Sequence, residues 1–154
     1  MPSDHNAIQS RLDALYQSIC FRKGEQPTFE SLRALFIPQG LLINNNNPAA
    51  PEVMSVDAFI EVVQSAIATG GLEEFHEREI ARRIEVFGNI AHVFSTYEAR
   101  FDADSKEPFS VGINTIQLVR TGASGSEDWL VSSMAWNDET TERPIPTQYR
   151  TAHQ

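Results

Sequence analysis

Histidine, cysteine and serine are the side chains of this chain that could bind a metal ion or act as nucleophiles, but their spacing favours neither role. The four histidines show no helical spacing and no neighbouring cysteine, so we predict no metal site and no cofactor. These histidines are His5, His76, His92 and His153. A serine nucleophile needs a histidine base and an orienting acid, and no elbow motif brings His76 to Ser95 or Ser132. Cys20 is expected to be a small core residue.

Arg82 is the residue whose surroundings point to function, because alternation along its predicted strand places its guanidinium among inward-facing apolar side chains. A buried cation needs a partner. Two interpretations stay open: Arg82 anchors an anionic ligand, or it pairs with a carboxylate on a helix. The first predicts a ligand pocket with a polar centre. The predicted pocket residues are Arg82, Ser95, Tyr97, Thr115, Gln117, Ser132, Met134, Trp136, Tyr16 and His76.

The elements that must position these residues are helices in the first half of the chain and strands in the second. Apolar residues at helical spacing predict helices over about 4–22, 28–36 and 55–69, capped by Ser or Asp, Thr and Ser. A short strand is expected at 41–43, before the asparagine-rich loop 44–47. A period near two predicts four long strands over about 73–87, 90–102, 111–120 and 129–137.

Helices that precede a meander of antiparallel strands indicate an α+β fold. We expect three helices against one face of a curved, mostly antiparallel sheet of four long strands and one short strand, shaped as a cone with a pocket. A two-residue turn at Gly88-Asn89 sets Arg82 opposite Ser95. A symmetric second hairpin then sets Ser95 opposite Gln117.

The opposite face of this sheet is too apolar for an open surface. We therefore predict a homodimer through it. The predicted interface residues are Phe94, Glu98, Arg100, Ile116, Leu118 and Val131.

Composition bounds the kind of protein and its partners. The 154 residues suit one domain over 1–154, with a core of about 3–140 and a tail at 141–154. Twelve Lys and Arg against 21 Asp and Glu give a net charge of −9, which argues against binding to nucleic acid or to anionic membranes. We see no signal peptide, no membrane span and only one cysteine, so a reducing cytoplasm is the expected location.

Three stretches carry a resemblance to a known superfamily. They are GNIAHVFSTYE at 88–98, GINTIQL at 112–118 and WLVSSMAW at 129–136. With the order of elements, they resemble uncharacterised bacterial members of the nuclear transport factor two-like superfamily, also called the SnoaL-like or cystatin-like α+β cone. The resemblance covers about residues 3–140. It implies the cone fold and dimerisation through the sheet, but it does not imply one function, because the superfamily includes both enzymes and binding domains.

Catalysis is the point on which the chain departs from the enzymes of that superfamily. Ketosteroid isomerases carry an aspartate base near the end of the first short strand, where this chain has asparagines at 44–47. Tyr16 and Tyr97 can donate hydrogen bonds, but the predicted inner face has no Asp or Glu. The leading hypothesis is a binding protein for a small, partly apolar and anionic molecule. The alternatives are a lyase, isomerase or hydrolase, and a non-catalytic dimerisation or accessory domain.

Overall fold

A computed structural model describes residues 3–122 and 128–151 of the chain, and the predicted tail residues 152–154, with His153, lie outside this range. One six-stranded sheet runs in the order β2-β1-β6-β5-β4-β3 and is accompanied by three helices. The elements are α1 (Asp4–Ile19), α2 (Phe29–Ala34), β1 (Phe36–Asn44), β2 (Glu52–Ser55), α3 (Val56–Ala68), β3 (His76–Phe87), β4 (Ile90–Arg100), β5 (Ser110–Arg120), β6 (Trp129–Asp138) and the short 3₁₀ helix η2 (Thr147–Tyr149).

Local capping chemistry explains where the longer helices begin. The hydroxyl of Ser3 accepts a hydrogen bond from the Asn6 amide at 3.2 Å, and that of Ser55 accepts one from the Ala58 amide at 3.0 Å. Gly70, with φ of +80°, ends α3 in a conformation that other residues avoid. Among the described helices, none combines the length and the apolar character that a membrane crossing requires.

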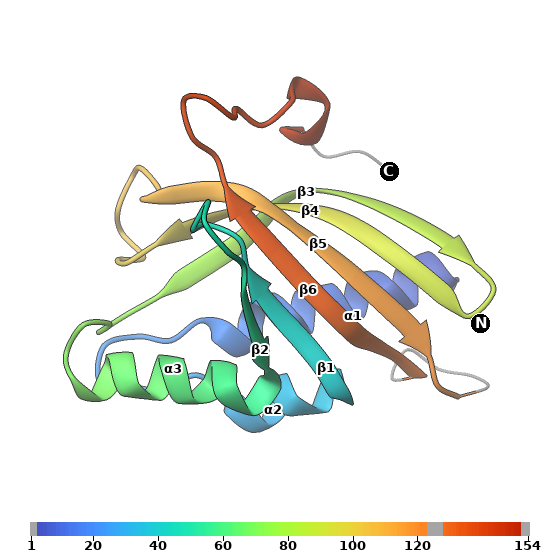
Figure 1. Ribbon diagram of the computed structural model, residues 1–154, viewed down its shortest axis with the longest axis horizontal. Helices are drawn as coiled ribbons and strands as arrows, with labels where there is room; N and C mark the ends of the chain where they lie inside the picture. The colour runs from blue at the N-terminus through green and yellow to red at the C-terminus, as the bar shows by residue number, and fades with distance from the viewer. Residues whose placement is uncertain (1–2, 123–127, 152–154) are drawn as a thin grey trace.

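The first strand is longer than predicted. We expected a helix to continue through Phe36, but the chain is already extended there, because β1 pairs in parallel with β6 and Phe36 lies opposite Val131. The predicted strand at 41–43 is the end of this element, and β2, which pairs antiparallel with β1, was not predicted. The α+β class with three helices and an open sheet is confirmed, with six strands instead of five. Figure 1 shows the sheet curving over α1, with α2 and α3 gathered at the end of β1 and β2.

Strand register decides which side chains enter the core. Between β3 and β4 it is as predicted near the turn, with Arg82 opposite Ser95. Between β4 and β5 the prediction is wrong: Ser95 lies opposite Asn114, not Gln117. The pairing shifts by an odd number of residues, so every side chain of β5 lies on the face opposite to the one predicted.

Three of the predicted interface residues are therefore corrected to core residues. Ile116, Leu118 and Val131 are almost fully buried in the hydrophobic core, against side chains of the helices and the neighbouring strands. They made the predicted outer face look apolar because the register placed them on the wrong side of the sheet. Burying them inside removes much of the reason for an outer interface.

The remaining outer-face residues have partners within the chain. Phe94 packs against Tyr149, with ring centroids 5.1 Å apart, and the Thr96 hydroxyl donates to the Tyr149 carbonyl at 2.6 Å. Glu98 accepts hydrogen bonds from Arg78 and Arg100 at 2.5 and 2.7 Å. The described part of the predicted tail, residues 141–151, thus lies over the sheet on the side away from α1 (Figure 1). The homodimer itself stays a prediction.

Candidate functional site

A cavity of about 280 Å³ lies between the inner face of the sheet and the helices. Its lining is dominated by aliphatic and aromatic side chains from both layers. The apolar lining residues are Leu15, Ile19, Phe21, Pro27, Phe29, Leu32, Leu42, Phe59, Val63, Leu72, Phe75, Ala99, Phe101, Phe109, Met134 and Trp136. The polar lining residues are Ser18, Asn46, Glu77, Tyr97, Ser110, Asn114 and Asp138. A few polar groups in an apolar hollow are typical of small-molecule sites.

A β-bulge places the acidic residues of β3 in this interior. The pairing of β3 with β4 shifts between Glu79 and Ala81, so that Glu79 lies opposite Tyr97 and Ala81 lies opposite Thr96. Before the bulge the alternation is reversed, and Glu77 and Glu79 lie on the inner face. The prediction that this face holds no Asp or Glu is therefore wrong.

Glu79 is the acceptor that organises a chain of hydrogen bonds below the cavity. The Ser95 hydroxyl donates to the Glu79 carboxylate, so the Ser95 oxygen accepts from Tyr16 at 2.6 Å. Because the Tyr16 hydroxyl donates its proton to Ser95, the Tyr16 oxygen accepts a hydrogen bond from Asn114 Nδ2 at 3.0 Å. Asn114 Nδ2 also donates to Glu77 Oε2 at 3.4 Å. Each donor in the series therefore points toward Glu79, which sets the orientation of the Asn114 amide.

Glu77 is the titratable group at the cavity wall. Burial raises its pKa from 4.5 to about 7, the Asn114 hydrogen bond lowers it in part, and the negative charge of Asp138 raises it further. At neutral pH this carboxyl is therefore divided between its acid and its base form. Such a group can both accept and donate a proton.

Tyr97 and Asp138 form a second polar pair that spans three strands. The Tyr97 hydroxyl donates to the Asp138 carboxylate, and Asn46 Nδ2 donates to the other carboxylate oxygen at 3.1 Å. Burial, and then the bond to Asp138, raise the pKa of Tyr97. Gly112 lies between the partners on β5. A Cβ at Gly112 would lie 2.3 Å from the Tyr97 oxygen, so only glycine lets this side chain cross the strand.

Arg82 lies outside the cavity lining and is paired. Its Nε is 2.5 Å from Glu79 Oε1, and its Nη2 is 3.1 Å from Asp13 Oδ1 on α1. The geometry thus matches the second of the two interpretations, in which Arg82 pairs with a helix carboxylate, and a carboxylate of its own strand joins the pair. It borders a separate hollow together with Arg83, His92 and Tyr149.

The other predicted pocket residues fall into three groups. Tyr97, Met134 and Trp136 line the cavity, while Tyr16 and Ser95 lie beneath it in the hydrogen-bond chain. Thr115, Gln117 and Ser132 do not line it, because the β4–β5 register differs from the prediction and the β5–β6 pairing shifts between Gln117 and Leu118. His76 does not line it either, since the bulge turns it away from the interior and it bonds to Glu74 at 2.6 Å.

Glu77, Asn114 and Asp138 are the functional candidates that the sequence analysis missed. Asn114 follows at once from the correct register. Its signal was Gly112, two residues earlier on the same face, because a strand glycine marks a close approach by another group. The bulge that turns Glu77 inward left no sequence signal that we recognise.

Comparison with known proteins supports the fold. No protein-family model and no curated protein matches the chain. Among solved structures it is similar to a cystatin-like protein of unknown function from Nostoc punctiforme (TM-score 0.65, 10% identity, 88% of this chain and 90% of that one). It is also similar to an NTF2-like protein of unknown function from Shewanella baltica (TM-score 0.59, 12% identity, 90% of this chain and 95% of that one). A third similar structure is that of a candidate aromatic ring hydroxylase from Novosphingobium aromaticivorans (TM-score 0.63, 12% identity, 89% of this chain and 90% of that one). The predicted NTF2-like, cystatin-like fold is confirmed.

Replacing Gly112 by alanine tests the crossing of Tyr97 over β5. The new Cβ would lie 2.5 Å from the Asn137 carbonyl oxygen as well as against the Tyr97 ring, so strands or ring must move. We expect Gly112→Ala to lower the free energy of unfolding by about 1–3 kcal/mol, measured by urea denaturation. Gly71→Ala is the control, since its Cβ would meet nothing closer than 3.7 Å. Equal effects of the two changes would contradict the crossing.

Replacing Glu77 by glutamine tests its raised pKa. The folded-state value of about 7 exceeds the ordinary 4.5, so the carboxyl stabilises the fold least once it is ionised, and stability falls as pH rises between these values. We expect Glu77→Gln to match the wild type near pH 4 and to exceed its free energy of unfolding by roughly 2–3 kcal/mol at pH 8. The control Glu61→Gln, at an exposed position of α3, should show no such trend. A difference independent of pH would refute the assignment.

Proposed function

We propose that this protein binds a small, largely apolar molecule in the cavity between its sheet and its helices. The observation that carries the proposal is the cavity itself, whose apolar lining surrounds a few convergent polar groups. Burial of an apolar ligand against such a lining is favourable in proportion to the area removed from water. The fold neighbours of unknown function are compatible with this role but do not specify it.

The charge of the site leads us to replace the anionic ligand that the sequence suggested. The only Arg, Lys, Asp or Glu side chains in the described cavity lining are Glu77 and Asp138, both acidic. Arg82, the anchor proposed for an anion, is paired with Glu79 and Asp13. A carboxylated ligand would add negative charge beside two acidic side chains, at a cost that burial increases.

Binding can be tested with 2-phenylethanol, an uncharged ring compound. At a hundred times its dissociation constant it should stabilise the fold by roughly 2.7 kcal/mol, which thermal denaturation detects. Ala99→Leu fills part of the cavity and should reduce the shift strongly, whereas Ala135→Leu, on the other side of the sheet, should leave it unchanged. A shift that is the same in both variants would place binding elsewhere and overturn the proposal.

Acid–base catalysis is a second candidate function, favoured by the position of Glu77. Its pKa of about 7 suits proton transfer near neutral pH, and its apolar surroundings resemble those in which catalytic carboxyls act. Proton abstraction from a bound ring compound would account for this carboxyl in an otherwise apolar wall. One fold neighbour carries the name of a candidate aromatic ring hydroxylase, which favours a ring-shaped substrate and indicates nothing about mechanism.

The one-step elimination of 5-nitrobenzisoxazole, in which a base removes a carbon-bound proton and a coloured phenolate forms, tests this function. We expect a rate above that of buffer, rising with pH through about 7 as Glu77 ionises. Glu77→Gln should lower kcat/KM by about a hundredfold, and Glu85→Gln should leave it unchanged. Equal rates for Glu77→Gln and the wild type would exclude Glu77 as the base.

A further inference from the structure

Most hydrogen-bond donors among the polar residues of the cavity lining already donate to neighbouring side chains. The Tyr97 hydrogen is given to Asp138, and Asn46 Nδ2 also donates to Asp138. The Asn114 amide donates to Tyr16 and to Glu77. The Ser110 hydroxyl also lines the cavity and has no hydrogen-bond partner among the described residues, so it can donate or accept. Glu77 and Asp138 keep free lone pairs, so hydrogen-bond donors on a ligand find acceptors on this wall.

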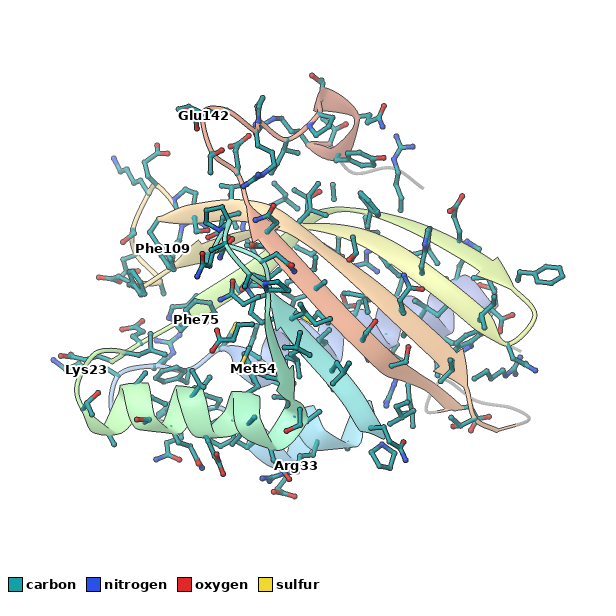
Figure 2. All side chains as sticks on the ribbon, viewed as in Figure 1. Lys23, Arg33, Met54, Phe75, Phe109 and Glu142 are labelled. Carbon is teal, nitrogen blue, oxygen red and sulfur yellow. The ribbon has the colours of Figure 1, made fainter. Side chains whose placement is uncertain are left out.

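Aromatic rings surround the same space. Phe101 and Phe109 stack with centroids 3.7 Å apart, and Phe75 meets Phe109 edge to face at 6.3 Å. On the helix side, Phe59 meets Trp136 edge to face at 6.1 Å. Figure 2 shows Phe75 and Phe109 at one end of the molecule, Phe75 ahead of β3 and Phe109 on the connection between β4 and β5. Ring faces carry a negative potential that attracts cations.

Phe101 and Phe109 are about half exposed, although both line the cavity. They therefore lie where the cavity meets solvent. A ligand that enters there passes aromatic surface first and reaches the carboxylates further along the wall.

Resting on the proposed binding function, we propose that the ligand is a hydrophobic amine. Its protonated nitrogen is held by Glu77, next to Asp138, and its hydrocarbon part lies among the aromatic rings. An ammonium supplies donors for the two carboxyl groups and a positive charge, which no residue of the described lining carries. A divalent metal is a poorer candidate, because the described residues contain no group of three or more His, Cys, Asp and Glu placed to hold one.

Binding of an amine next to Glu77 should change the number of protons that this carboxyl holds. Four titratable groups surround Glu77: Tyr16 on α1, Cys20 directly after α1, Tyr97 on β4 and Asp138 on β6. Asp138 is the charged one among them, and its effect is to hold a proton on Glu77. An ammonium has the opposite effect, so its binding near pH 7 should release up to about half a proton per ligand.

Three probes that share one phenyl group test the inference on the intact chain: 2-phenylethylamine, 2-phenylethanol and 3-phenylpropanoate. Isothermal titration at pH 7, in buffers of different ionisation enthalpy, measures affinity and proton release together. We expect the amine to bind at least about tenfold tighter than the alcohol, with proton release, and the carboxylate to bind weakest. Glu77→Gln should lose that tenfold preference and the proton release, whereas the alcohol should bind as before. The control Glu85→Gln makes the same chemical change on the same strand outside the cavity.

The outcomes separate this inference from the function on which it rests. If the alcohol binds in the cavity as tightly as the amine, or the carboxylate binds best, the amine is excluded and the binding function remains. If the amine is preferred but Glu77→Gln and Glu85→Gln weaken it equally, general electrostatic attraction to an acidic protein explains the preference, and the inference is overturned. If no probe stabilises the fold or gives heat, both proposals fall. Asp138→Asn is a second variant, expected to reduce amine affinity while leaving the Glu77 carboxylate in place.

Discussion

The bulge in β3 is the constraint on which the candidate site depends. One extra residue between Glu79 and Ala81 reverses the side-chain alternation, so residues 76–79 lie on the faces opposite to those expected from the pattern of residues 81–87. Without it, His76 and Arg78 would face the interior, and the two glutamates would lie in solvent. With it, Ile84 and Val86 pack against the apolar core, while the first part of β3 brings the two carboxyl groups to the inner face.

Those two carboxyl groups have different roles because their partners differ. Glu79 has a guanidinium partner in Arg82 and a donor in Ser95, so its charge is compensated inside the molecule. The Glu77 side chain accepts a long hydrogen bond from Asn114, and the unfavourable charge of Asp138 lies nearby. Glu79 therefore stabilises the structure, whereas Glu77 is available to bind a ligand or a proton.

The cavity and the hydrogen-bond chain beneath it share residues, which couples packing to chemistry. Tyr16 belongs to the buried face of α1 and also holds the Asn114 amide toward Glu77. Gly112 is small because Tyr97 must pass over it to reach Asp138. The chain thus gives up side-chain volume at one strand position to join the polar groups of three strands.

The sequence by itself determined the fold class, the order of most elements, the serine caps of α1 and α3 and the β3–β4 turn, whereas the predicted cap Thr28 makes no side-chain hydrogen bond. These follow from local signals: apolar period, capping residues and the Gly88-Asn89 pair. Only the tertiary structure decided the face of β5 and the inner side of β3 before the bulge. A register shift by an odd number of residues, or one bulge, moves every side chain beyond it to the other face. The bulge has no mark in the local composition, and the face of β5 is marked only by Gly112. The partner of Arg82, the inward position of Glu77 and the acidic character of the cavity all followed from those two decisions.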